Sequence, residues 1–436
     1  MARAKKEAAL TPEERLQAAL VPDWEWPYKL PENWCWTYFK SISTIQTGRK
    51  DANYGSDEGK YPFFTCAAEP IRCHGYSFDC RAILLAGNGD INNISRYNGK
   101  FEAYQRTYVV KIAEPLCFDY IFYWFKYRWF DFNKGKMFGT AIPYIRLGNL
   151  QEFPTPIPPL AEQQRIVDRI ESLFAKLDEA KEKAQAVVDS FETRKAAILH
   201  KAFTGELTAK WREEHGVRME SWEVRTLDSV CSSIFDGDHM PPPKAESGIP
   251  FLVISNVNTG HLTFENTRFV PQEYYDTLSD TRKPQLGDVL YTLVGSFGIP
   301  VVVNSKRPFC FQRHMALLRP IDVSPQFLWY ILQTPEMYDK ASSIATGTAQ
   351  LTVPIKGLRA MTIPRPNIAE QVEIVRILDG FFAREQSAKE AAEAVLDQID
   401  LMKKSILARA FRGELGTNDP TEESAVELLK KVFQKE

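Results

Sequence analysis

Two stretches of the chain place apolar residues at alternating spacings of three and four, which is the pattern of an amphipathic helix. The first stripe consists of Ile166, Ile170, Leu173, Leu177, Ala180, Ala184, Val187, Phe191 and Ile198. The second stripe consists of Ile374, Leu378, Phe381, Ala388, Ala392, Val395, Ile399, Met402 and Ile406. A repeat sustained over about five heptads is typical of a coiled-coil seam. The pattern therefore predicts two long helices that pair with each other.

Part of this interpretation stays open. Each stripe could instead pack on its own globular neighbour, although two matched stripes of equal length favour pairing. Glu385 interrupts the second stripe at the position that Leu177 holds in the first. We expect this carboxylate either to fix the register of the helices or to face solvent near an end.

An internal duplication explains why the two stripes match. Ala161-Glu162-Gln163 recurs 208 residues later as Ala369-Glu370-Gln371. At this offset Pro156–Leu207 aligns without a gap with Pro364–Leu415, and 24 of the 52 positions are identical. The same offset matches Gly139-Thr140-Ala141 with Gly347-Thr348-Ala349 further upstream. The chain therefore contains a repeated unit.

Prolines and glycines mark where each helix begins and ends. The prolines before the helices are Pro154, Pro156, Pro158, Pro159, Pro364 and Pro366. Gly205 and Gly413 stand where a helix C-cap is expected. At the N-terminus Thr11-Pro12-Glu13-Glu14 has the pattern of a capping box, which predicts one short helix. The polar C-terminal tail contains one amphipathic stretch, Ala425–Phe433.

The segments before the two helices are rich in aromatic and β-branched residues and are punctuated by Gly, Asn, Asp and Pro. Strand-like runs are Ala82–Leu85, Tyr108–Ile112, Val289–Val294 and Pro300–Val303. The fold class that we predict is α+β, with two α/β domains alternating with two long helices in a pseudo-twofold internal repeat. The predicted boundaries are an N-terminal helical segment at 1–23, a first domain at 24–153, a first helical spacer at 154–208, a second domain at 209–361, a second helical spacer at 362–416 and a tail at 417–436.

Composition places the chain among ordinary globular proteins, with 44% hydrophobic and 25% charged residues in 436. No apolar run approaches the roughly 20 residues that a membrane span needs. Met1–Leu10 lacks the apolar segment of a secretory signal, so we expect a cytoplasmic protein. Seven cysteines without a C-x-x-C pattern fit free thiols in a reducing compartment. A net charge of −2 does not by itself indicate a nucleic-acid partner.

The common catalytic patterns are missing from the sequence. There is no phosphate-binding G-x-x-x-x-G-K-[ST] loop and no Asn/Asp-Pro-Pro-aromatic tetrad for base methylation. Gly87-Asn88-Gly89 does not continue into a dinucleotide-binding motif. The spacing of Cys66, Cys73, His74 and Cys80 fits no common zinc pattern, and free thiols are the simpler interpretation. We therefore expect a protein with no catalytic residues, no metal and no cofactor of its own.

One local feature does indicate a nucleic acid. Between Arg96 and Arg146 the chain has nine Lys and Arg against four Asp and Glu, interleaved with tyrosines. Lys and Arg neutralise phosphates, whereas Asn, Gln and Arg read base edges. In the first domain the candidate DNA-binding residues are Arg49, Lys50, Asn88, Asn92, Asn93, Arg96, Lys134, Lys136 and Arg146. In the second they are His239, Lys244, Asn256, Asn258, Arg313, His314, Gln350, Lys356 and Arg359.

These motifs make the chain resemble the specificity subunit of a type I restriction–modification enzyme. The resemblance rests on the Pro-x-Pro-Pro-Leu-Ala-Glu-Gln-Gln-Arg-Ile-Val run at 156–167 and its echo at 364–375. The Ala-Phe-x-Gly-Glu-Leu endings, Trp211-Arg212-Glu213-Glu214-His215-Gly216 and Gly347-Thr348-Ala349-Gln350 also fit. It covers essentially the whole chain. The stretch before Trp34 is longer than the family pattern, which leaves its role open.

The resemblance implies two target recognition domains held apart by an antiparallel pair of helices that form a coiled coil. It also implies a bipartite double-stranded DNA target, two methyltransferase subunits on the helices, and restriction subunits that translocate DNA. S-adenosylmethionine, ATP and Mg²⁺ are expected on those partner subunits. The family does not supply base-contacting residues, because the recognition domains are its variable parts. Two domains on one helical pair independently suit a two-part DNA site, since tethering makes the second contact intramolecular.

Two other functions stay open at this point. The chain could be a stand-alone DNA-binding or scaffolding protein that uses its helices to dimerise. It could also be the recognition half of a single-chain restriction–methylation enzyme, which the missing methylase motif disfavours.

Overall fold

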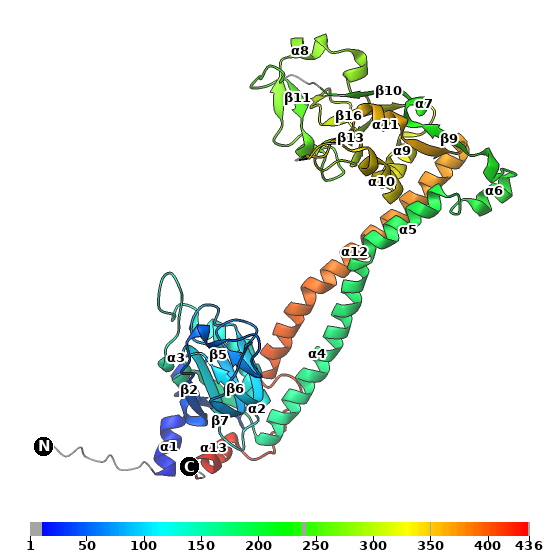
Figure 1. The fold of residues 1–436 in the computed structure, drawn as a ribbon. Helices are drawn as coiled ribbons and strands as arrows, with labels where there is room; N and C mark the ends of the chain where they lie inside the picture. Colours follow the sequence, from blue (N-terminus) through cyan, green and yellow to red (C-terminus); the bar gives the residue numbers. More distant parts are fainter. Residues whose placement is uncertain (1–10, 238–240, 349, 435–436) are drawn as a thin grey trace. The chain divides into compact units, whose positions relative to one another are not determined.

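The repeated segments form the predicted long helices in the computed structural model (Figure 1). The first repeat forms α4 (Leu160–Asp189) and α5 (Phe191–Phe203), and the second forms the 43-residue helix α12 (Ile368–Ala410). Ser190 separates α4 from α5, and its Oγ donates back to the carbonyl of Ala186, a bond that competes with the helical pattern. Gly205 and Gly413 follow the helices with φ of 84° and 73°, the left-handed conformation expected of a helix end.

The structure describes residues 11–237, 241–348 and 350–434. They group into two units. Unit 1 contains the described residues up to Ala184 and from Ala394 onward, and unit 2 contains Gln185–Glu393. Each unit therefore holds one mixed domain together with parts of both long helices. In the described part of the chain, no helix combines the length and apolarity needed to cross a bilayer.

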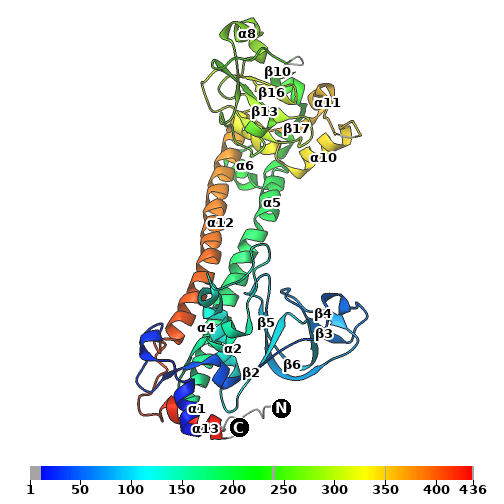
Figure 2. The same cartoon turned by 90° about the vertical axis from the view of Figure 1, so that its left-hand side faces the viewer.

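Unit 1 is built on a six-stranded sheet with the order β2-β7-β5-β6-β3-β4. Its strands are β2 (Ser43–Thr47), β3 (Tyr61–Phe64), β4 (Ile71–Cys73), β5 (Phe78–Ala86), β6 (Ile94–Ala103) and β7 (Thr107–Ile112). A separate pair joins β1 (Cys35–Tyr38) to β8 (Pro154–Ile157). The helices are α1 (Pro12–Ala19), α2 (Phe118–Asn133), α3 (Leu147–Gln151) and α13 (Ala425–Gln434). Figure 2 shows β3 and β4 on the side of the sheet that lies away from α4.

Unit 2 divides its strands among three sheets, with the orders β10-β16-β13-β14, β12-β11-β15 and β17-β9. The strands are β9 (Glu223–Thr226), β10 (Cys231–Asp236), β11 (Ile249–Leu252), β12 (Arg268–Val270), β13 (Val289–Thr292), β14 (Pro300–Val302), β15 (Cys310–Phe311), β16 (Met315–Pro320) and β17 (Thr362–Arg365). Its shorter helices are α6 (Ala209–His215), α7 (Leu227–Val230), α8 (Gln272–Thr277), α9 (Pro325–Ile331), α10 (Pro335–Ile344) and α11 (Ile355–Ala360). The predicted alternation of mixed domains and long helices is confirmed.

The long helices contact each other inside both units. In unit 2, Arg194 of α5 pairs with Glu385 of α12, and Lys389 lies 4.9 Å from the centre of the Phe191 ring. Residue numbers rise along α5 as they fall along α12, so the two helices run antiparallel there. In unit 1, Lys403 of α12 pairs with Asp178 and lies over the ring of Phe174 on α4.

The outer ends of the apolar stripes pack differently. Ile166 and Ile170 belong to the core of unit 1, and Ile374 and Leu378 belong to the core of unit 2. All four side chains are fully buried. The open alternative, packing on a globular neighbour, therefore describes these ends, while the contacts between helices occur further along the stripes.

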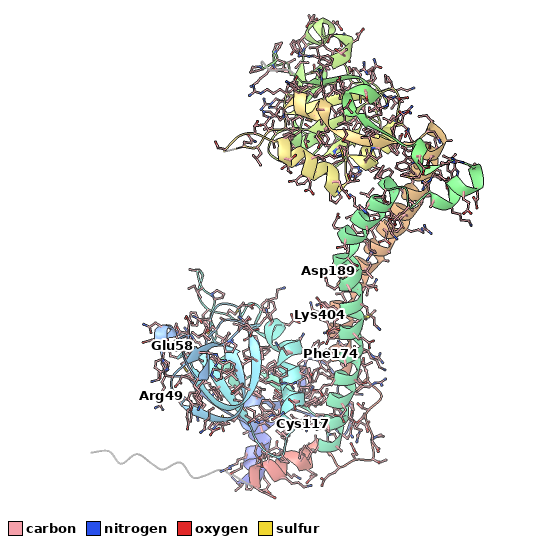
Figure 3. The ribbon with its side chains drawn as sticks, turned by 45° about the vertical axis from the view of Figure 1, so that its right-hand side comes forward. Arg49, Glu58, Cys117, Phe174, Asp189 and Lys404 are labelled. Carbon is pink, nitrogen blue, oxygen red and sulfur yellow. The ribbon has the colours of Figure 1, made fainter. Side chains whose placement is uncertain are left out.

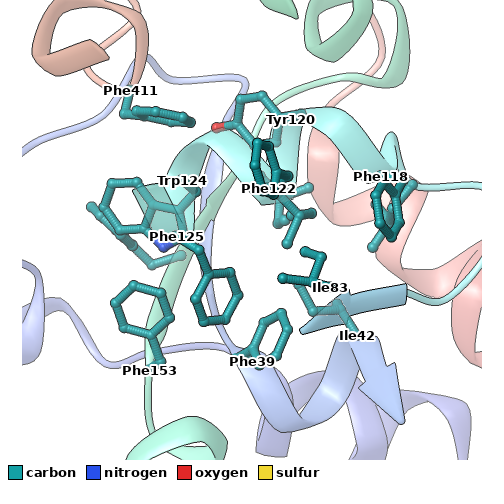
Figure 4. Close-up of a cluster of buried hydrophobic side chains, with 14 of the residues drawn as sticks. Phe39, Ile42, Ile83, Phe118, Tyr120, Phe122, Trp124, Phe125, Phe153 and Phe411 are labelled. Carbon is teal, nitrogen blue, oxygen red and sulfur yellow. The ribbon is translucent and has the colours of Figure 1, made fainter. Parts of the chain in front are cut away.

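Aromatic residues dominate the core of unit 1 (Figure 4). Trp124 of α2 stacks on Phe153 with ring centroids 5.6 Å apart, and it also contacts Phe411 with centroids 5.0 Å apart. Phe125 contacts both Phe39 and Phe153. Since Phe411 directly follows α12, this cluster fixes the end of the long helix to the first domain.

The N-terminal segment has a defined structural role in unit 1. Thr11 caps α1 through the predicted capping box. After α1 the chain is extended, and Val21 N–H donates to the carbonyl of Trp36 over 3.1 Å on the edge of β1 that faces away from β8. In unit 2 the equivalent strand β9 has the same register, since Val224 lies opposite Pro364 as Trp36 lies opposite Pro156. Val224 is 75% exposed and Trp36 only 1%, so only the first strand is covered.

Candidate nucleic-acid interface

Four loops of unit 1 meet at one end of its sheet. They are residues 48–51 after β2, 87–93 after β5, 104–106 between β6 and β7, and 138–146 before α3. Backbone hydrogen bonds join these loops. Gly87 N–H donates to the carbonyl of Arg106 over 2.8 Å, and Ile145 N–H donates to the carbonyl of Gly87 over 2.9 Å. Gly89 N–H donates to the carbonyl of Pro143 over 2.8 Å. We call this set of loops the loop corner of unit 1.

A short hairpin forms the outer part of this corner. Phe138 and Tyr144 exchange two backbone hydrogen bonds of 2.9 Å each, which close the hairpin. Gly139 at its tip has a φ of 83°, and an added Cβ would lie 2.6 Å from the carbonyl oxygen of Ile142. Arg146 follows the hairpin and lies 3.9 Å from the centre of the Phe138 ring. The hairpin therefore exposes backbone and the Thr140 hydroxyl together with the apolar side chains of Phe138 and Ile142, and Arg146 is exposed directly after it.

Unit 2 repeats this arrangement with the same bonds. Its loop corner consists of Gly237, residues 293–299, residues 312–314 and the hairpin 346–352. Leu293 N–H donates to the backbone carbonyl of His314 over 2.8 Å, and Val353 N–H donates to that of Leu293 over 2.9 Å. Gly295 N–H donates to the carbonyl of Leu351 over 3.0 Å. Thr346 and Thr352 close the hairpin with bonds of 2.9 and 2.8 Å, and Gly347 has a φ of 115°. Ala349 lies outside the described residues.

Two glycines show how closely the corners correspond. A Cβ on Gly48 would lie 1.9 Å from the carbonyl oxygen of Ala103, and one on Gly237 would lie 2.1 Å from that of Phe311. Both positions therefore require glycine, because the neighbouring backbone leaves no room for a side chain. The two domains share the frame of this corner although their sequences differ.

Most candidate residues of the first domain lie in or beside the loop corner. Arg49 is exposed, and Figure 3 shows it on the side of the domain away from α4. Asn88 bridges to Tyr144 at the base of the hairpin. The remaining candidates of this group are Lys50, which lies 4.4 Å from the centre of the Tyr54 ring, Asn92, Asn93, Lys134, Lys136 and Arg146. Asn93 uses its amide to donate to the carbonyl of Cys66 over 2.9 Å, so it stabilises the loop.

Arg96 is placed differently. Its guanidinium pairs with Asp119 and lies 3.8 Å from a carboxylate oxygen of Glu171. It also stacks on Phe122, with 4.8 Å between the guanidinium carbon and the ring centre. These contacts hold Arg96 against α2 and α4, away from the loop corner, and do not support it as a base reader.

The candidates of the second domain are more scattered. Arg313, His314 and Gln350 lie in the loop corner, where burial and the nearby Arg313 lower the pKa of His314. Lys244, Asn258 and Lys356 are exposed elsewhere on the unit. His239 lies outside the described residues.

Two further candidates of the second domain are engaged within the protein. Asn256 is 2% exposed, accepts from Val253 N–H over 3.0 Å and donates to the carbonyl of Glu265 over 3.0 Å. Arg359 donates to the carbonyl of Ile234 and lies over the Phe235 ring. Their placement supports a structural role and leaves neither side chain available to a base edge.

Sequence reasoning missed Arg106. It is exposed in the turn before β7, directly beside Gly87 of the loop corner. The duplication contained the signal, because the offset of 208 residues aligns Arg106 with the candidate His314. No group of three or more His, Cys, Asp or Glu in the described residues is arranged to hold a metal, and none of the seven cysteines, all of them described, forms a disulfide.

Comparison with known proteins identifies the family. The model of the type I restriction modification DNA specificity domain matches residues 31–188 and 219–396, one match for each half of the duplication. The chain belongs to this family. The EcoDI specificity subunit of Escherichia coli is 28% identical over 415 residues, which cover 89% of this chain and 92% of that protein.

Solved structures of specificity subunits share the fold. The HsdS subunit from Thermoanaerobacter tengcongensis has a TM-score of 0.62 at 22% identity, covering 90% of this chain and all of that one. A chain from a study of the assembly and conformational transition of a type I system has a TM-score of 0.65, also at 22% identity, covering 89% of this chain and 100% of that one. The predicted architecture is thus that of this specificity-subunit family.

Proposed function

We propose that this chain is the DNA specificity subunit of a type I restriction–modification complex, in which the loop corner of each unit reads one half of a bipartite DNA target. The observation that carries the proposal is the repeated loop corner. Its backbone frame is the same in both units, but the polar side chains that it leaves exposed or partly exposed differ: Arg49, Lys50 and Asn88 in unit 1 against His314 and Gln350 in unit 2. One frame with two sets of polar side chains suits two different half-sites.

The long helices are the surface that we propose for the methyltransferase subunits. In unit 1, α12 exposes Val395, Leu401 and Met402 by 41%, 65% and 47%. Apolar side chains left in solvent along one helix favour a protein partner, since covering them removes apolar area from water. In this proposal two methyltransferase subunits and the restriction subunits supply the catalysis. S-adenosylmethionine, ATP and Mg²⁺ bind to those subunits, and the complex acts on cytoplasmic DNA.

Exchange of one recognition domain tests the proposal. Residues 209–361 are replaced by the equivalent domain of a relative with a known target, and the chimera is expressed with its methyltransferase partner. Methylated bases are then mapped across the genome. We expect one half-site to change and the other to stay as it was. The unchanged half-site is the internal control for folding and assembly.

A simultaneous change of both half-sites would contradict separate readers. A chain that binds its target equally well without any methyltransferase subunit would favour the stand-alone alternative. Purifying the chain alone and with its partner, and comparing their affinities for the same duplex, separates these two cases.

A further inference from the structure

The two hairpins share a sequence although the domains around them differ. The sequence Gly-Thr-Ala begins at Gly139 and again at Gly347, and Gly139-Thr140 and Gly347-Thr348 occupy equivalent places in the two hairpins. Backbone hydrogen bonds fix each hairpin to the loop after β5 or β13. Thr140 and Thr348 are both exposed. Core packing therefore does not explain why these threonines occur at both tips.

A shared exposed loop also cannot explain different half-sites. If Thr140 and Thr348 read base edges through the same geometry, both half-sites would carry the same base at that place. Phosphates and sugars are the parts of a duplex that do not vary with sequence, and hydroxyl and backbone N–H groups are among their usual donors. A contact common to both domains is therefore better suited to the backbone of DNA than to its bases.

The charge beside each hairpin has the sign that phosphate requires. The turn beside the hairpin carries exposed Arg106 in unit 1 and exposed Arg313 in unit 2, where Arg313 directly precedes His314, the residue equivalent to Arg106. Within the described residues, neither guanidinium forms a hydrogen bond or an ion pair. In unit 1 the nearby carboxylates are engaged: Asp90 accepts from Asn92 N–H over 2.9 Å, and Asp51 accepts from the Gln105 amide over 2.8 Å. A recess of about 360 Å³ lined by Gly87, Arg106 and Ile145 opens beside the arginine.

We propose that each loop corner holds one backbone phosphate of the DNA through its Gly-Thr hairpin tip and the neighbouring arginine, Arg106 in unit 1 and Arg313 in unit 2. This inference rests on the proposed DNA-binding function. It assigns these residues to sequence-independent anchoring and leaves reading of the bases to the side chains that differ between the corners.

The test uses the assembled methyltransferase, made with Arg106→Gln, Arg313→Gln or both substitutions, and with Thr140→Val and Thr348→Val. Binding to the target duplex and to a non-target duplex is measured between low and moderate salt. Each arginine substitution should lower the affinity of the complex for both duplexes by about tenfold at low salt. It should also reduce the slope of log affinity against log salt by about 0.9. The ratio of target to non-target affinity should not change.

Arg72→Gln is the matched control, because Arg72 is an exposed arginine on β4, outside the loop corner. It should leave both the affinity and the salt slope close to those of the unmodified complex. Thermal unfolding and the mass of the assembled complex are recorded for every variant.

Three results would overturn the inference. A changed preference at a single base pair would make the arginines base readers. Loss of methyltransferase assembly, with DNA binding per complex unchanged, would make the corners a protein interface. Affinities equal to those of the control would show that no phosphate is held. The domain exchange described above can succeed in all three cases, so failure here is distinct from failure of the proposed function.

Discussion

Arg194 donates from Nε to the carboxylate of Glu385 over 2.7 Å, between α5 and α12. Glu385 is the residue that interrupts the apolar stripe, and of the two expected outcomes the structure shows the pairing. The offset of the duplication places Leu177 and Met402 at the corresponding positions of the other unit. The same place along the helices is thus apolar in unit 1 and ionic in unit 2. A single polar pair in such a seam favours one register over others.

This relationship predicts how unit 2 responds to substitution. Arg194→Met or Glu385→Leu alone should destabilise unit 2 by about 2 kcal/mol, because each leaves a partly buried charge without its partner. The double substitution introduces the residue types that unit 1 has at the corresponding positions and leaves no unpaired charge, so it should return to within about 1 kcal/mol of the original stability. Urea unfolding of the three variants gives these free energies. A double variant whose loss equals the sum of the single losses would contradict direct coupling.

How far the sequence predicts the fold depends on the range of the interaction involved. The 3-4 stripes, the prolines and the helix-ending glycines act locally, and the helices and their ends were predicted correctly from them. The break at Ser190 was not predicted, since it depends on whether a serine side chain bonds back to the helix. The packing of Ile166 and Ile374 into globular cores was also beyond the stripe pattern, which cannot distinguish one apolar neighbour from another.

In the candidate site, too, local features could be predicted from the sequence and tertiary contacts could not. Residue type and local charge indicated that polar loops of both domains face a nucleic acid. They could not distinguish Arg49 from Arg96, which is also exposed but is paired with Asp119 of another element. Nor could they show that Asn256 closes its own loop. These outcomes are set by tertiary contacts, whereas Arg106 could have been found by extending the repeat.

Glu162 near the start of α4 and Glu370 near the start of α12 are equivalent residues of the repeat, so the energetic contributions of their ion pairs can be compared. Both carboxylates are fully buried. Glu370 accepts from Arg212, Thr208 and Trp222 at 2.6, 2.7 and 2.8 Å. Because Arg212 is 8% exposed, Glu370→Ala should leave its charge buried and unpaired, at a cost of about 3–5 kcal/mol.

The equivalent substitution Glu162→Ala should cost less. Its partner Arg165 is 39% exposed at the side chain and keeps a second carboxylate, Glu422, at 2.8 Å. We expect a loss of about 1–2 kcal/mol. Hydrogen exchange measures the loss of stability, in unit 2 for Glu370→Ala and in unit 1 for Glu162→Ala. Equal losses at the two sites would show that burial of the arginine does not determine the energy.

Burial should also make two cysteines unreactive. It raises the pKa of both Cys35 and Cys231 to about 12, and the thiolate is the reactive form. At pH 8 in the native protein, N-ethylmaleimide should therefore leave these two thiols unmodified while it reacts at the partly exposed Cys66 and Cys80. In urea all seven should react. Mass spectrometry of the labelled peptides checks this, and rapid native labelling of Cys35 would contradict its burial in the core of unit 1.

The N-terminal segment should stabilise unit 1 by covering β1. Leu16 and Val21 are 6% and 4% exposed, and they lie in the same core as Trp36. Leu16→Ala should therefore destabilise unit 1 by about 3 kcal/mol through the lost apolar contacts and the cavity left behind. Trp24→Ala is the control in the same segment, because Trp24 is 85% exposed and its removal should change stability by less than about 0.5 kcal/mol.

Hydrogen exchange locates the effect of this segment. In a chain lacking residues 1–22, the carbonyl of Trp36 loses the hydrogen bond that it accepts from Val21 N–H. Amides of β1 and β8 should then exchange faster, because opening this strand pair exposes less additional apolar surface. The equivalent strands β9 and β17 should be unaffected, since β9 has no such cover in the described structure and Val224 is already in solvent. Unchanged exchange in β1, or faster exchange in β9 instead, would show that the segment does not act by covering the first strand pair.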